Sequence, residues 1–159
     1  MNKNQLLNEI VASLSKSLSV LEGAARASHA EATHESSKAE SKYDTRGLEA
    51  AYLAGGQARQ AKEILYSIKL YQSLTLKRFT PGEAIDLTAL VELEAAGERS
   101  TYFIGPKNGG LEIEVQGREV TVITPQSPLG QNLMGKNAGH RWSAKQGAAT
   151  IKYHVVSVA

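Results

Sequence analysis

Two segments in the first half of the chain carry small or apolar residues at alternating spacings of three and four. The first series runs through Leu7, Val11, Leu14, Leu18, Leu21, Ala25, Ser28 and Ala32. The second runs through Ala51, Ala54, Ala58, Ala61, Leu65, Ile68 and Gln72. A heptad repeat of this kind predicts two helices that pack together along a seam.

The residue numbers predict that the two helices run antiparallel. Partners across an antiparallel hairpin have numbers with a constant sum, and Leu18 with Leu65 and Ala25 with Ala58 both give 83. Half of that sum places the turn near Ser41, inside the polar segment from His34 to Thr45. An arm of about thirty residues, at about 1.5 Å per residue, would carry this tip roughly 45 Å from its base.

An ordinary helical hairpin inside a larger bundle fits the same seams, although the rest of the chain offers no further long helix. At the turn, Ser37 with Glu40 and Ser41 with Asp44 both fit a capping box, which predicts that the second helix starts between residues 37 and 44. Gly55 and Gly56 lie inside that helix, where each costs on the order of 1 kcal/mol relative to Ala. They mark either a close approach or a weak point.

After residue 79 the periodicity changes from helical to two. Short alternating strands are predicted at residues 85–87, 90–94, 101–104, 111–115, 120–123 and 148–158, separated by Gly-containing turns. Within this half one short helix is predicted. Ser127 is its N-cap, Pro128 takes its first position and Gly135 ends it. We therefore expect an α+β chain: an antiparallel coiled-coil arm over residues 1–79 with its tip near 35–44, then an antiparallel sheet domain over 80–159.

Composition excludes several classes of function. The formal net charge of +2 is too small for a protein that binds DNA by phosphate neutralisation, and the absence of cysteine excludes disulfides and thiolate chemistry. No unbroken apolar run of signal-peptide or membrane-spanning length occurs near the N-terminus. We expect a soluble, cytoplasmic protein without sequence-specific DNA binding or a membrane partner.

The arm and the motif that follows it resemble the bacterial Gre transcript-cleavage factors. Ser127, Pro128, Leu133, Gly135 and Lys136 match that family's Ser-Pro helix, which ends in Leu-Ile-Gly-Lys. Tyr43 and Asp44 match the Tyr-Asp at the start of its second helix. The resemblance covers nearly the whole chain, and it implies that the sheet domain is FKBP-like.

The resemblance also implies a function. Gre factors dock the C-terminal domain beside the secondary channel of RNA polymerase and insert the coiled coil, so that tip acids help hold Mg²⁺ at the polymerase active site. The polymerase then cuts backtracked RNA near its 3′ end and resumes elongation. By this resemblance the chain stimulates a nuclease without being an enzyme or holding a cofactor of its own, and its docking residues are Ser127, Pro128, Leu133, Gly135 and Lys136.

The tip departs from the family pattern. Counting back seven and four positions from Tyr43, where the family has acids, gives Ser36 and Ala39. Glu35 and Glu40 each lie one residue away, and they are the candidate catalytic and Mg²⁺-binding acids, with Asp44 as a weaker candidate. Because they are five residues apart, they converge only if the chain turns between them. Capping and solvation explain the same residues without any metal.

Other candidate sites have little support in the sequence. His29 and His34 do not have the spacing of two zinc ligands on one helix face, and His140 and His154 have no partner pattern. Prolyl isomerase activity would need an aromatic pocket, for which this half offers only Tyr102, Phe103, Trp142 and Tyr153. Two alternatives to transcript cleavage therefore remain: a non-catalytic regulator or inhibitor in the same channel, and a coiled-coil adaptor for another protein.

Overall fold

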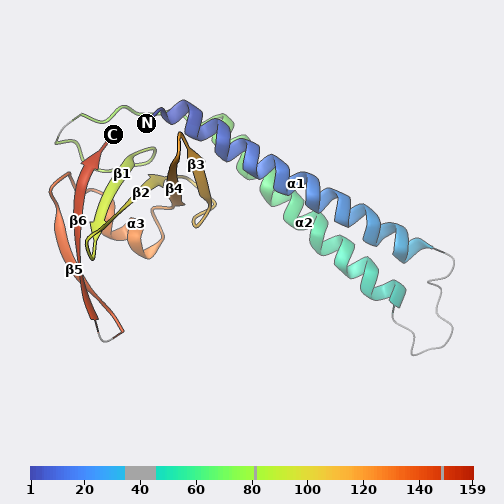
Figure 1. Cartoon of the computed structure of the whole chain (residues 1–159). Coiled ribbons are helices and arrows are strands. Elements are labelled where there is room, and N and C mark those ends of the chain that lie inside the picture. The colour runs from blue at the N-terminus through green and yellow to red at the C-terminus, as the bar shows by residue number, and fades with distance from the viewer. Residues whose placement is uncertain (35–45, 81, 148) are drawn as a thin grey trace. The chain divides into compact units, whose positions relative to one another are not determined.

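The computed structural model describes residues 1–34, 46–80, 82–147 and 149–159. Two long helices, α1 (Lys3–Thr33) and α2 (Arg46–Gln72), precede a six-stranded sheet with one short helix, α3 (Pro128–Leu133) (Figure 1). The predicted α+β class, a helical hairpin followed by a sheet with one short helix, is confirmed. The structure divides into a helical unit, Val11–Gln72, and a sheet unit made of Met1–Ile10 and Ser73–Ala159. The predicted domain boundary after residue 79 stays a prediction.

The seam predicted for α1 lies on the covered side of the helix. Every member of the series from Leu7 to Ala32 is buried or half-buried, and Leu14 is 5% exposed. Leu18 and Ala25 line one groove between the helices together with Ala58 and Leu65. These four residues therefore lie along the same stretch of the two helices, while the exact register with a sum of 83 stays a prediction.

The seam predicted for α2 is correct at only part of its positions. Ala54, Ala61 and Ile68 are buried, whereas Ala51, Ala58, Leu65 and Gln72 are exposed. The covered series is instead Ala50, Ala54, Gln57, Ala61, Ile64, Ile68 and Tyr71. Ala50 and Ala51 are adjacent, as are Ile64 and Leu65, so the sequence fits two neighbouring seams that share Ala54, Ala61 and Ile68.

The glycines of α2 do not mark a close approach. In the part of the chain that the structure describes, no atom lies within 4 Å of the position a Cβ would take on Gly55 or Gly56. Of the two readings left open by the sequence, the structure therefore favours a weak point in the helix.

The sheet has the strand order β3-β4-β2-β1-β6-β5. Its strands are β1 (Leu90–Ala95), β2 (Glu98–Ile104), β3 (Glu112–Val115), β4 (Arg118–Ile123), β5 (Arg141–Gln146) and β6 (Ala149–Val158). Four neighbouring pairs are antiparallel, as predicted, but β2 and β4 are parallel. This pair was missed because β3 and its turn separate the two strands in sequence, and β3 pairs with the other edge of β4.

Two further details differ from the prediction. Strand β5 was not predicted, and residues 85–87 form no strand; Ile85 instead exchanges backbone hydrogen bonds with Gly135 and Lys136 at 2.9 and 2.7 Å. The β1–β2 and β3–β4 hairpin turns lie at the glycines, as predicted. Residues 96 and 97 have φ of 52° and 85°, and residues 116 and 117 have φ of 55° and 71°. Two successive positive φ angles are typical of the type I′ turn, which matches the twist of the flanking strands.

The core of the sheet unit lies between the sheet and α3. Its buried members are Phe79, Ile85, Ala89, Val91, Leu93, Ile104, Ile123, Leu133 and Val155. Val91 and Leu93 alternate with Glu92 and Glu94, so one face of β1 is apolar and the other is charged. Across the described residues, no helix is long and apolar enough to cross a membrane.

Candidate functional site

The predicted tip acids Glu35, Glu40 and Asp44 lie outside the described residues, as do both predicted capping boxes. The helix that leads to the tip ends at Thr33, whose hydroxyl donates to the carbonyls of His29 and Ala30 at 3.0 and 3.2 Å. On the other side, the description resumes at Arg46 at the start of α2. The roles of the three acids and of Mg²⁺ stay predictions.

The helical unit exposes large apolar side chains next to the tip. Leu48, Tyr52 and Leu53 are 56, 73 and 56% exposed, and they lie in the first two turns of α2. Exposed apolar groups that gather in one region are more typical of a contact surface than isolated ones are. The acids Glu35, Glu40 and Asp44 were predicted from the sequence as functional residues of this region, whereas these apolar residues were not.

The Ser-Pro motif builds a capped helix. The Ser127 hydroxyl accepts from the Gly130 amide at 3.0 Å and donates to the Thr124 carbonyl at 2.8 Å, while Pro128 occupies the first turn. This is the expected N-cap geometry, in which a side-chain oxygen satisfies an amide that lacks a helical partner. The prediction of a Ser-capped, Pro-initiated helix is confirmed.

The five predicted docking residues divide into internal and exposed positions. Leu133 is fully buried in the core, and Gly135 adopts φ of 75° while its amide donates to Ile85. Pro128, Gly135 and Lys136 are exposed. Of the five residues, these three lie on the surface available to a partner, while Ser127 and Leu133 hold the helix in place.

Lys3, in the first turn of α1, contacts the segment between α2 and β1. Its Nζ donates to the carbonyls of Thr88, at 3.2 Å, and Lys77, and it lies 4.9 Å from the centre of the Phe79 ring. Burial, together with the positive charge of Arg78, lowers the pKa of the Lys3 amine from its ordinary value. Lys77 lies over the same ring at 4.8 Å, so Phe79 interacts with two cations.

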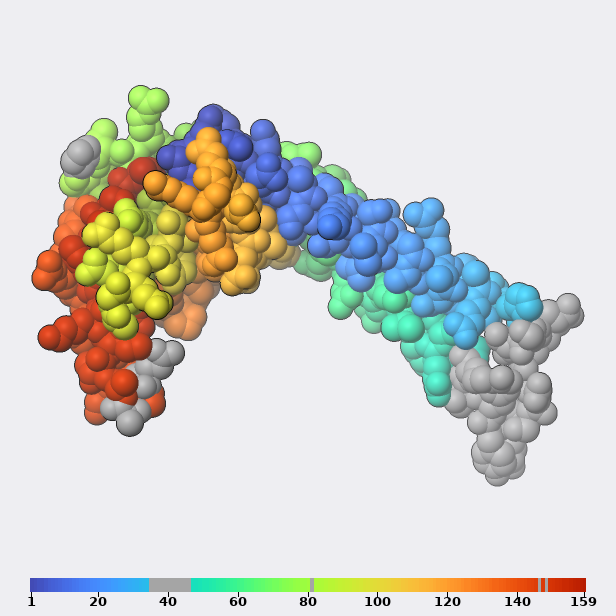
Figure 2. Space-filling view, viewed as in Figure 1, coloured from blue at the N-terminus to red at the C-terminus, as the bar shows by residue number. Residues whose placement is uncertain are grey.

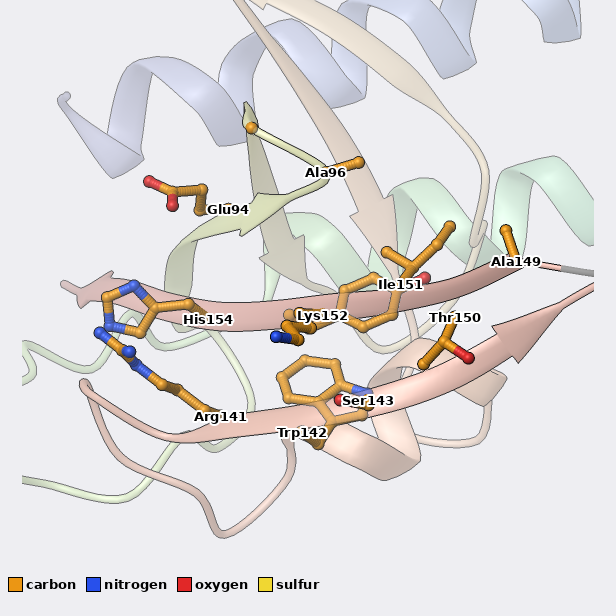
Figure 3. Close-up of a pocket in the computed structure, with 12 residues that line it drawn as sticks. Glu94, Ala96, Arg141, Trp142, Ser143, Ala149, Thr150, Ile151, Lys152 and His154 are labelled. Carbon is orange, nitrogen blue, oxygen red and sulfur yellow. The ribbon is translucent and has the colours of Figure 1, made fainter.

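A cavity of about 740 Å³ lies at the end of the sheet where the β5–β6 hairpin meets the β1–β2 turn (Figure 3). We call it the hairpin groove. Its lining is made of Glu94, Ala96, Gly97, Arg141, Trp142, Ser143, Ala149, Thr150, Ile151, Lys152, Tyr153 and His154. No motif in the sequence pointed to it, because it forms between strands that are distant in the chain.

Trp142 stacks with two neighbouring rings. The centre of the His140 ring lies 5.7 Å from that of Trp142, and the centre of the Tyr153 ring lies 4.8 Å away in a nearly parallel plane. Phe103 is fully buried, and Tyr102 packs against the core. The aromatic residues considered for a prolyl isomerase pocket therefore do not line one common cavity.

Among the described residues, no group of three or more His, Asp or Glu side chains is placed to hold a metal ion. The candidate metal acids of the tip, Glu35 and Glu40, lie in the segment 35–45, outside those residues.

No protein-family model and no curated protein matches the chain. Among solved structures, GreA factor homolog 1 (Gfh1) of Thermus thermophilus is 23% identical over 94% of both chains, with a TM-score of 0.37. Gfh1 of Thermus aquaticus is 23% identical over 92% of both chains, with a TM-score of 0.38. A GreA/GreB elongation factor of Nitrosomonas europaea is 17% identical, over 65% of this chain and 78% of its own, with a TM-score of 0.37.

The chain is similar to Gre-type proteins. The identities and TM-scores are low, so this similarity does not extend to activity. Function must be inferred from the residues of this chain.

Proposed function

We propose that the chain is a Gre-like factor that binds RNA polymerase through its secondary channel and stimulates cleavage of backtracked RNA. The observation that carries the proposal is a two-helix hairpin whose connection contains Glu35, Glu40 and Asp44. Such an arm can present carboxylates at a site that a compact domain does not reach. The nuclease is the polymerase, and the chain supplies groups to it in trans.

The chemistry of the connection suits this role. Carboxylate oxygens are the protein ligands that Mg²⁺ prefers, and Glu35 and Glu40 would hold the ion together with the polymerase. When bound, Mg²⁺ activates water and neutralises charge in phosphodiester hydrolysis. Asp44 also fits a capping box with Ser41, so we take Glu35 and Glu40 as the principal acids.

Two features of the described residues support contact with a partner protein. Leu48, Tyr52 and Leu53 give the arm an exposed apolar region beside the tip. In the sheet unit, the capped helix α3 exposes Pro128, and Lys136 follows it on the surface. A bacterial factor of this kind would act in the cytoplasm, where transcription takes place.

The experiment is RNA release from stalled, backtracked polymerase complexes. We expect the wild-type chain to accelerate cleavage, Glu40→Ala to abolish most of the acceleration and Glu22→Ala, an exposed acid elsewhere on α1, to leave it unchanged. Polymerase binding of all three proteins is measured in parallel. Absence of polymerase binding by the wild type would reject the proposal.

A second function is favoured by one observation: Ser36 and Ala39 stand where the related tips carry acids. In this alternative the chain occupies the same channel without supporting cleavage and regulates the polymerase. Wild-type binding to polymerase without faster cleavage would select it. Binding to neither polymerase nor the elongation complex would select the third possibility, an adaptor for another protein.

A further inference from the structure

The β5–β6 hairpin extends beyond the strand that flanks it. Pairing between β1 and β6 ends at Ala95 and Tyr153, whereas pairing between β5 and β6 continues to residues 146 and 149. Figure 1 shows the hairpin passing beyond the β1–β2 turn, and Figure 2 shows it as a projecting ridge. Residues 149–152 of β6 therefore have no β1 partner, and the hairpin groove lies beside them.

One face of this hairpin is basic. Arg141, Ser143 and Lys145 alternate with the core-facing Trp142, and in the register of the hairpin they oppose His154, Lys152 and Thr150. Arg141 and Lys145 are about 13 Å apart along the strand, with Lys152 opposite the position midway between them. Figure 3 shows the Arg141 and His154 side chains extending from facing positions on the two strands.

The cations of this face are available for a partner. Arg141, Lys145 and Lys152 are exposed, and none of them forms an ion pair with a described residue. Residues 120–159 contain four Lys or Arg and no Asp or Glu. The acid that borders the groove, Glu94, is already paired with Arg99 at 3.3 Å.

The backbone of β5 offers a second kind of interaction. This strand is at the edge of the sheet and pairs with β6 alone among the described strands. The outer N–H and C=O groups of an edge strand can pair with an added extended peptide, whose alternate side chains then lie on one face. Acidic residues at alternate positions would face Arg141 and Lys145.

We propose that the β5–β6 hairpin binds an extended acidic segment of a partner protein, added as a strand along β5 with its carboxylates on Arg141, Lys145 and Lys152. A single-stranded nucleic acid fits less well, because the ring that could stack on its bases, Trp142, already stacks with His140 and Tyr153 of its own chain. The proposal does not depend on polymerase binding.

The test is a titration of the full chain with a short peptide of alternating Glu and Thr residues, followed by calorimetry and by fluorescence of Trp142, the single tryptophan of the chain. We expect saturable binding that weakens as salt is added, because exposed charges are screened. A peptide of alternating Lys and Thr should not bind.

Variants identify the surface. Reversing two charges in Arg141→Glu/Lys152→Glu should weaken binding by about tenfold or more. The neutral pair Arg141→Gln/Lys152→Gln should weaken it less, and Lys16→Glu, a reversal on α1 outside the groove, should leave it unchanged. Circular dichroism spectra and melting temperatures establish that each variant is folded.

Three results would overturn the proposal. The first is absence of saturable binding of the acidic peptide by the wild type. The second is equal binding by the wild type and by a folded double-reversal variant, which would leave the edge lysines as a device against sheet aggregation. The third is tighter binding of a single-stranded oligonucleotide than of an acidic peptide of the same charge.

Discussion

Among the glycines compared in the described part of the chain, Gly130 has the least room for a side chain. A Cβ at this position would lie 1.9 Å from the Thr124 carbonyl oxygen and 2.9 Å from the Ser127 hydroxyl, the two groups that hold the start of α3. We expect Gly130→Ala to lower the free energy of unfolding of the sheet unit by about 1–3 kcal/mol, since overpacking forces backbone shifts. Urea denaturation followed by Trp142 fluorescence measures this. An unchanged midpoint would mean that α3 moves away at little cost.

Glu83 makes the stability of its turn depend on pH. The Thr80 amide and hydroxyl both donate to its carboxylate, and with Lys77 at 3.7 Å they lower the pKa of Glu83 below its ordinary value of 4.5. A lowered pKa contributes stability that is present above pH 4.5 and is lost as the pH falls through the folded-state pKa.

Glu83→Gln should therefore remove a stabilising effect at neutral pH and have little effect in acid. The measurement is urea denaturation of wild type and variant at several pH values, and the two curves of stability against pH should converge below pH 4.5. Parallel curves would show that the charge of Glu83 does not contribute.

Single residues were predictable where a local rule applies. The roles of three residues of α3 were identified, because each acts within a few residues of its own position: Ser127 caps the helix, Pro128 begins it and Gly135 follows its end. The contacts of Lys3 and Trp142 were not predicted, because their partners are distant in sequence: Thr88 and Phe79 for Lys3, and Tyr153 for Trp142.

At the level of elements, α2 shows the limit of a pattern built from small residues. The α1 series contains leucines, all of which lie on the covered side, whereas in α2 the neighbours Ala50 and Ala51, like Ile64 and Leu65, offer alternatives of similar volume. Strand β5 was missed for a related reason, since Ser143, Ala144 and Lys145 are weak strand formers and the strand depends on pairing with β6. The existence of two long helices was predictable because it depends on the repeat of three and four, which both candidate seams of α2 share.

Substitution of Gly55 tests whether this glycine weakens α2. Because no described atom approaches its would-be Cβ, Gly55→Ala gains helix propensity without a clash. We expect it to stabilise the helical unit by about 0.5–1 kcal/mol. Thermal melting followed by the helical circular dichroism signal measures this. Destabilisation would mean that another group closes on Gly55 in solution, and the same substitution at Gly130 should have the opposite sign.

At the level of the whole molecule, the first ten residues belong with the sheet although they are the start of α1. Leu6 and Ile10 are fully buried, and the Gln5 side chain accepts from Gln116 at 3.0 Å. The heptad series treated Leu7 as the first position of the arm, so the sequence did not predict this double role. The division between the two units falls inside α1, after Ile10, and the amino-acid composition of the helix does not change there.

A fragment of residues 73–159 should therefore be less stable than the same fragment joined to residues 1–10 through a short Gly/Ser linker. Leu6 and Ile10 are buried in the intact chain, and we expect the decapeptide to bury them against the fragment, where each fully buried side chain is worth about 1.5–3 kcal/mol. Urea denaturation followed by Trp142 fluorescence compares the two. The control fusion carries Leu6→Ser and Ile10→Ser and should behave like the bare fragment, because it keeps the added chain but loses the apolar contact. Equal stability of all three proteins would show that the sheet unit folds without the start of α1.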